Sequence, residues 1–267
     1  MSKIGVFDSG LGGLCAVREI RKVLSGEDII YFGDTGRVPY GNKSCETIRK
    51  YGQQSVNFLR EKNVDIILAA CGTVSSVALG ELQGGCGVPV LGIIEGACEK
   101  AVRIAGAAGN KKIGVIGTQA TVASGAFEKY IKKLDGSCEV YARACPLFVP
   151  LVENGHIQAG DMIAKLAAEK YLADLRGLGL ACLILGCTHY PMLKDIIGEA
   201  IGTELIDAGA EAAHKLKRVI GRGSPDKKPG ALEIFISDEG MCFSEIASGF
   251  LGFDIKSGIS KINIENY

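Results

Sequence analysis

Lys3-Ile4-Gly5-Val6-Phe7-Asp8-Ser9 has a near copy later in the chain, Lys112-Ile113-Gly114-Val115-Ile116-Gly117-Thr118. Each copy is a short apolar run of the kind that forms a strand buried on both faces. Two further segments repeat in the same order. The first is an apolar run that ends in cysteine, and the second is an isoleucine followed by one acidic residue and then by small residues. These segments are Leu68–Thr73 with Ile184–His189, and Ile94–Ala97 with Ile206–Ala210. The matched order favours a duplication over a chance likeness between strand ends.

Strands and helices alternate along the chain, which predicts an α/β protein with mainly parallel sheets. Residues Ile48 to Lys62 follow three-four spacing and predict a half-buried helix. The predicted strands are Lys3–Phe7, Asp28–Phe32, Asp65–Ala70, Val88–Ile93, Lys112–Ile116, Glu139–Ala142, Ala181–Leu185, Glu204–Ile206 and Leu232–Ile236. With the duplication, this predicts two facing, pseudo-symmetric α/β halves with a cleft between them.

Composition excludes several classes of function. Thirty basic and thirty acidic residues cancel, so charge gives no reason to expect binding to nucleic acid or to an anionic membrane. No signal-peptide pattern opens the chain, and no apolar run approaches the roughly 20 residues of a membrane span. Ten cysteines without a single Cys-x-x-Cys pair argue against zinc ribbons and thioredoxin-like sites. We therefore expect a cytoplasmic protein with reduced thiols.

Cys71 and Cys187 occupy matching places at the ends of two predicted strands, where open α/β sheets bind ligands. Two thiols facing each other across a cleft could remove a proton from one face of a carbon and return one to the other. Each cysteine precedes a predicted helix, Ser75–Leu82 or Pro191–Ile197, whose N-terminus would favour a thiolate. Asp8 and His189 are the nearest candidates to tune these thiols. The remaining cysteines are interpreted as packing residues: Cys15, Cys45, Cys86, Cys98, Cys138, Cys145, Cys182 and Cys242.

Four ordered motifs resemble those of the glutamate racemases, and the resemblance runs from about residue 3 to residue 214. They are Asp8-Ser9-Gly10-Leu11-Gly12-Gly13, Asp34-Thr35-Gly36-Arg37-Val38-Pro39-Tyr40-Gly41, Cys145-Pro146-Leu147-Phe148-Val149-Pro150 and Cys187-Thr188-His189-Tyr190-Pro191. The resemblance implies a first domain of residues 1–96 plus 210–267, with a second, 97–209, inserted in it. It also implies interconversion of L- and D-glutamate without pyridoxal phosphate, another cofactor or a metal, supplying D-glutamate for peptidoglycan. Glutamate would be the partner molecule, and a homodimer is one allowed assembly.

By the same resemblance, Cys71 and Cys187 would be the acid/base pair, assisted by three further residues: Asp8, Glu153 and His189. The residues that would hold the substrate are Ser9, Pro39, Tyr40, Gly41, Gly72, Thr73, Thr118, Thr121 and Thr188. One position departs from the family, because Gly72 stands where the pattern Cys-Asn-Thr-Ala has asparagine. Since that amide contacts substrate in the family, we expect Gly72→Asn to be accepted and to raise kcat/KM for glutamate.

Other interpretations compete with this one. Gly10-x-Gly12 after a strand imitates a dinucleotide-binding loop, but Cys15 stands at the third glycine position. Cys187-Thr188-His189 could indicate a thiol hydrolase or a pair of metal ligands, but a total of three histidines and the lack of another ligand cluster argue against a metal site. Glu153 would by itself be a solvated loop carboxylate. Three hypotheses remain: a glutamate racemase, a related two-thiol racemase for another small amino acid such as aspartate, and a catalytically impaired relative.

Overall fold

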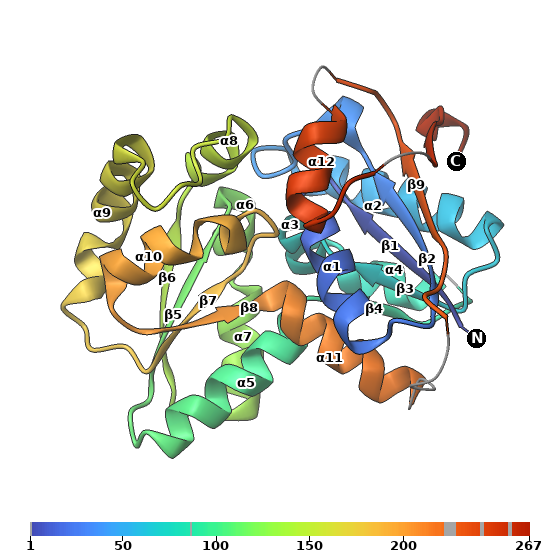
Figure 1. Cartoon of the computed structure of the whole chain (residues 1–267). Helices are drawn as coiled ribbons and strands as arrows, with labels where there is room; N and C mark the ends of the chain where they lie inside the picture. The colour runs from blue at the N-terminus through green and yellow to red at the C-terminus, as the bar shows by residue number, and fades with distance from the viewer. Residues whose placement is uncertain (1, 86, 222–227, 241–242, 256–257) are drawn as a thin grey trace.

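The computed structural model describes residues 2–85, 87–221, 228–240, 243–255 and 258–267. Two parallel sheets lie side by side, and helices cover both faces of each (Figure 1). The six-stranded sheet has the order β10 (Ile259–Lys261), β9 (Leu232–Ile236), β2 (Asp28–Gly33), β1 (Lys3–Asp8), β3 (Ile66–Ala69), β4 (Val90–Gly92). The four-stranded sheet has the order β6 (Glu139–Ala144), β5 (Lys112–Gly117), β7 (Cys182–Leu185), β8 (Glu204–Asp207).

The two sheets share one topology. In the first, β1 lies between β2 and β3 with β4 beyond; in the second, β5 lies between β6 and β7 with β8 beyond. All of these pairs are parallel, and the repeated sequence motif forms the inner strand, β1 or β5, each time. The predicted α/β class with parallel sheets is confirmed, and the internal repeat corresponds to a repeated strand order. β9 and β10 extend only the first sheet.

Helices α5 and α11 connect the two sheets. The chain leaves the first sheet along α5 (Ile94–Ala107) and returns along α11 (Ala208–Ile220), and these two helices pack against each other (Figure 1). The two helices approach closely, since a Cβ added to Gly96 would lie 2.7 Å from the carbonyl oxygen of Glu211, and small buried residues such as Ala97, Ala101 and Ala212 occur along both. One of the two apolar core clusters runs from the first sheet through both helices into the second. The exact domain boundaries, at residues 96/97 and 209/210, stay a prediction.

The other helices flank the sheets. They are α1 (Leu14–Val23), α2 (Cys45–Glu61), α3 (Gly72–Val77), α4 (Leu79–Gly85), α6 (Gln119–Ser124), α7 (Ala126–Leu134), α8 (Phe148–Glu153), α9 (Met162–Arg176), α10 (Lys194–Ile201) and α12 (Phe243–Leu251). Three short 3₁₀ turns complete the described structure: η1 (Thr35–Arg37), η2 (Tyr190–Leu193) and η3 (Ile264–Asn266). Within the described ranges, none of the helices combines the length and apolar character needed to cross a membrane.

All nine predicted strands are present, with ends that differ by at most two residues. β10 was not predicted, because Ile259-Ser260-Lys261 is short and mixed in character. The helix predicted at Ser75–Leu82 is two helices, α3 and α4, and begins earlier, directly after Cys71.

Candidate active site

Cys71 lies at the carboxyl end of the first sheet. β3 ends at Ala69, and Cys71 is the N-cap residue of α3. The turn is held from inside, since Ser75 Oγ donates a 2.8 Å hydrogen bond to the carbonyl of Ala69. Cys71 is buried, and its Sγ lies 3.5 Å from Ser9 Oγ, which comes from the loop after β1. The thiol therefore lies at the end of β3, as the sequence predicted, and it also contacts the end of the neighbouring strand β1.

Cys187 lies at the matching place in the second sheet, but the chain continues differently. After β7 it makes a turn and the 3₁₀ segment η2, with Pro191 in its first turn, and α10 begins only at Lys194. The helix predicted at Pro191–Ile197 is thus a 3₁₀ turn followed by an α-helix, and the α-helix does not begin at the cysteine. The sulfur has side-chain partners instead: His189 Nδ1 lies 4.0 Å from Cys187 Sγ.

His189 links Cys187 to Glu153. The ring is almost fully buried, and its Nε2 lies 3.1 Å from Glu153 Oε1, on α8. The edge of the ring meets Phe250 of α12. Burial disfavours the imidazolium, but interactions with Cys187 and Glu153 outweigh this and raise the pKa of His189 to about 10. The imidazolium therefore persists at neutral pH, beside the Cys187 sulfur.

Cys71 has the opposite electrostatic surroundings. Burial, and after it the charge of Asp8, raise the pKa of the Cys71 thiol to about 12. Hydrogen bonds from Ser9 and from the N–H of Val74 in α3 act against this shift and are outweighed. The N-terminus of α3 does favour the thiolate, as expected, but desolvation of the sulfur is the larger effect. Cys71 is therefore a neutral thiol.

Asp8 joins the two halves. It is 1% exposed, and burial raises the pKa of its carboxyl group, while the charge of His189 acts in the opposite direction. Its Oδ2 accepts a 3.1 Å hydrogen bond from the N–H of Gly10. In the second half, Thr188 donates to Asp8 Oδ1 at 3.5 Å. Asp8 therefore acts on the Cys71 thiol in its own half and on His189 in the other.

Both cysteines line one small cavity, which encloses about 40 Å³. The structure brings most of the predicted site residues together around it. The lining consists of Ser9, Val38, Pro39, Tyr40, Gly41, Cys71, Gly72, Thr73, Thr118, Val149, Glu153, Cys187, Thr188 and His189. Thr121 lies one layer behind, accepting a 3.0 Å hydrogen bond from Thr118 Oγ1. Val38 and Val149 were not predicted as site residues, although both lie inside the quoted motifs; an apolar side chain carries no chemical signal of its own.

Two hydrogen bonds tie the halves together beside the cavity. Thr73 Oγ1 on α3 lies 3.0 Å from Thr118 Oγ1, at the start of α6. The N–H of Ala120 donates to the carbonyl of Gly41 at 3.1 Å. The Thr73 and Thr118 hydroxyls therefore satisfy each other, and a substrate held by them would exchange this one bond for its own.

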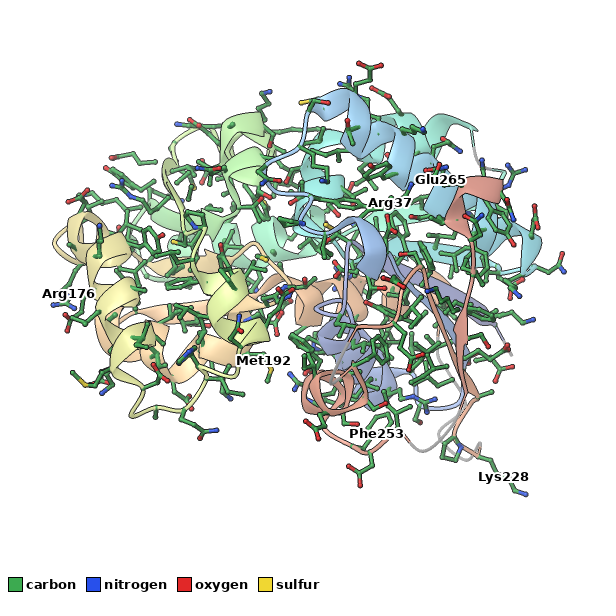
Figure 2. The ribbon with its side chains drawn as sticks, turned by 90° about the horizontal axis from the view of Figure 1, so that it is seen from above. Arg37, Arg176, Met192, Lys228, Phe253 and Glu265 are labelled. Carbon is green, nitrogen blue, oxygen red and sulfur yellow. The ribbon has the colours of Figure 1, made fainter. Side chains whose placement is uncertain are left out.

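The loop that carries Tyr40 and Gly41 is fixed from behind by a buried ionic network. Tyr40 Oη donates to Asp34 Oδ2, which also accepts a 2.7 Å hydrogen bond from Arg37 Nε. Arg37 in turn pairs with Glu265 at 2.8 Å, close to the C-terminus (Figure 2). This support was not predicted, because Glu265 lies far away in sequence.

Several sequence-based alternatives can be compared with the structure. In the part of the chain that is described, no three His, Cys, Asp or Glu side chains are grouped so that they could hold a metal ion. Of the cysteines interpreted as packing residues, Cys45 is exposed, while five lie buried: Cys15, Cys98, Cys138, Cys145 and Cys182. Cys86 and Cys242 lie outside the described residues.

Comparison with known proteins agrees with the geometry. The family model described as Asp/Glu/Hydantoin racemase matches residues 15–216. A glutamate racemase from Geobacter metallireducens is 43% identical over 254 residues, which cover 93% of this chain and 92% of the relative. The crystal structure of the Francisella tularensis glutamate racemase, in complex with D-glutamate, superimposes with a TM-score of 0.91 at 33% identity and covers 100% of this chain and 99% of its own. An aspartate racemase homologue from Pyrococcus horikoshii, 20% identical with a TM-score of 0.57 over 82% of this chain and 99% of its own, shares the fold.

Proposed function

The chain belongs to the Asp/Glu/hydantoin racemase family, and on that premise we propose that it interconverts L- and D-glutamate with Cys71 and Cys187 as opposed acid and base. The observation that carries the proposal is that cysteines from two matched strand ends line the same small cavity. The alternative substrate aspartate has less support, because the aspartate racemase homologue shares only the fold.

The proposed reaction moves two protons. A thiolate on one side removes the α-proton, and the electron pair of the broken C–H bond stays on the substrate as a carbanion. The thiol on the other side then gives its proton to the opposite face, so that the two sulfurs exchange protonation states. Because Cys71 is protonated and the His189 imidazolium lies beside Cys187, the starting state in this proposal has Cys187 as the base and Cys71 as the acid. The opposite enantiomer would require the opposite state.

Residues of both halves would hold the substrate. The hydroxyls of Ser9, Thr73, Thr118 and Thr188 line the cavity and can donate to carboxylate oxygens. Pro39, Tyr40 and Gly41 form one wall, fixed by the Asp34–Arg37 pair behind it. Because hydrogen bonds between the halves close the site, bound substrate would be shielded from water, which strengthens every electrostatic interaction with the carbanion.

The biological role follows from the proposed activity. D-glutamate would be supplied for peptidoglycan, and the reaction would take place in the cytoplasm without pyridoxal phosphate or a metal. The two-domain division at residues 96/97 and 209/210 belongs to the same proposal, because it places one cysteine in each domain. A homodimer stays a prediction.

Circular dichroism with L- or D-glutamate as the only substrate tests the activity. Both enantiomers should converge to the racemate, and in D₂O the product should carry solvent deuterium at the α-carbon. Conversion should continue after dialysis against EDTA. Turnover of aspartate but not of glutamate would mean that aspartate is the substrate. If neither amino acid is turned over and the fold is intact, the result would favour a catalytically impaired relative.

A further inference from the structure

Three glycines of the first half face the second half where a side chain would not fit. An ideal Cβ on Gly12 would lie 2.4 Å from Thr188 Oγ1, and one on Gly41 would lie 2.9 Å from Thr118 Cβ. The Thr188 hydroxyl can rotate away, and the overlap with Thr118 Cβ is mild. At Gly72 the obstacle is a backbone atom at much shorter range, since the added Cβ would lie 2.0 Å from the carbonyl oxygen of Gly186. Of these three positions, Gly72 would therefore demand the largest movement of the main chain.

Backbone conformation does not explain the glycine at this position. Gly72 is the first residue of α3, and it is not among the glycines with positive φ. Space is therefore the reason that a glycine suits the position. The expectation that asparagine would be accepted at position 72 is accordingly wrong for this structure, because asparagine carries the same Cβ.

The contact between Gly72 and Gly186 involves the sequence neighbours of both thiols. Gly72 directly follows Cys71, and Gly186 directly precedes Cys187. We propose that Gly72 is a positioning residue whose missing side chain sets how closely the two halves, and with them the two thiols, approach each other. This inference rests on the proposed two-thiol function and adds a determinant that is particular to this chain.

The expected size of the effect follows from the distances. Ordinary van der Waals contact begins at 3.4 Å, so the Gly186 carbonyl would have to move about 1.4 Å away from a Cβ at 2.0 Å. Thr73 is the next residue of α3, so the same shift would stretch its 3.0 Å hydrogen bond to Thr118. A misplacement of about 1 Å in a catalytic arrangement can cost about 100-fold in rate.

Gly72→Ala tests the proposal, because alanine adds the Cβ and nothing else. Gly80→Ala is the matched control, since Gly80 lies in the neighbouring helix α4 and no atom lies within 4 Å of its added Cβ. For Gly72→Ala, kcat with either enantiomer should fall about 10- to 100-fold, while Gly80→Ala should retain wild-type kinetics. Gly72→Asn compared with Gly72→Ala then isolates what the amide contributes at equal steric cost.

Alkylation with iodoacetamide, followed by peptide mass spectrometry, gives a readout independent of turnover. Cys71 and Cys187 are 4% and 7% exposed, and they should react several-fold faster in Gly72→Ala. Exposed Cys45 should keep its rate, and Cys98, fully buried in the core, should stay protected. Wild-type kinetics and labelling in Gly72→Ala would overturn the proposal, as would labelling of Cys98, which would show a loosened fold. If the wild type fails to racemise glutamate, the proposed function fails, and the labelling still tests the contact.

Discussion

The two cysteines occupy the same place in two copies of one strand order, yet their surroundings differ. Cys71 starts a short helix, touches the Ser9 hydroxyl and lies in the field of the Asp8 carboxylate. Cys187 is followed by a turn and touches a buried histidine that is charged at neutral pH. One thiol is thus kept neutral, while the other is given a positive neighbour.

This difference shows what a duplicated scaffold fixes and what it leaves free. The repeated strand order fixes where each sulfur lies, because the ends of β3 and β7 are set by their sheets. The loop residues after each strand decide the charge of the sulfur, and these have diverged between the halves. An acid and a base can therefore face each other in one cavity although both are cysteine.

Removal of either thiol should have the largest effect. Cys71→Ala or Cys187→Ala should lower racemisation by at least about 10³-fold, since one face then lacks its proton carrier. The two variants should differ in D₂O: each should retain at most α-proton exchange of a single enantiomer, and the enantiomer should not be the same. Cys45→Ala, at an exposed thiol, is the control. Racemisation near the wild-type rate in either variant would contradict the two-thiol mechanism.

Replacement of His189 should have an effect of intermediate size, and isotope effects should show that it acts at Cys187 only. His189→Gln should lower kcat/KM by roughly 10²-fold, equally in both directions because the enantiomers are equally stable. The proton transfer at Cys187 would then limit the rate. The isotope effect with α-deuterated substrate should therefore rise for the enantiomer that Cys187 deprotonates and fall for the other. Equal changes in both isotope effects would mean that His189 serves neither thiol in particular.

Glu153→Gln should reveal the interaction of Glu153 with His189 through the pH dependence of kcat/KM. A pKa raised to about 10 means that the imidazolium is present below that pH and is lost as pH rises through it. Removing the Glu153 charge should lower the pKa of His189, so the fall of kcat/KM at high pH should begin at lower pH than in the wild type. Glu169→Gln, at an exposed carboxylate of α9, should leave the profile unchanged. If the high-pH fall of kcat/KM is not shifted in Glu153→Gln, Glu153 does not support the charge of His189.

Ser9→Ala should give the smallest effect, and with the opposite asymmetry. Loss of the 3.5 Å contact to Cys71 removes one of the interactions that favour its thiolate. A hydrogen bond of this kind is worth about 1 kcal/mol, so kcat/KM should fall about fivefold. The isotope effect should now rise for the enantiomer that Cys71 deprotonates, the reverse of the His189→Gln result. If the isotope effects change in the same direction as in His189→Gln, Ser9 acts on Cys187 and not on Cys71.

The sequence predicted positions better than charges. The strands, the repeat and both cysteines could be placed because apolar runs and their ends are local signals. The protonation state of Cys71 could not, because it depends on desolvation by residues from several elements. The fit at Gly72 was missed for a similar reason: the obstructing carbonyl belongs to Gly186, which is distant in sequence and lies in the opposite half. The short strand β10 carried too little pattern to be predicted.

The pairing of β9 with β2 has a consequence for how the chain is made. All four strands of the second sheet lie between residues 112 and 207, so that sheet can form while the rest is still being synthesised. The first sheet keeps β2 as an open edge until Leu232–Ile236 has left the ribosome, and an open edge invites wrong pairing. Glu265, which holds Arg37 behind the substrate loop, also follows every strand of the second sheet in the chain. The half whose first strand is translated first is thus completed after the other half.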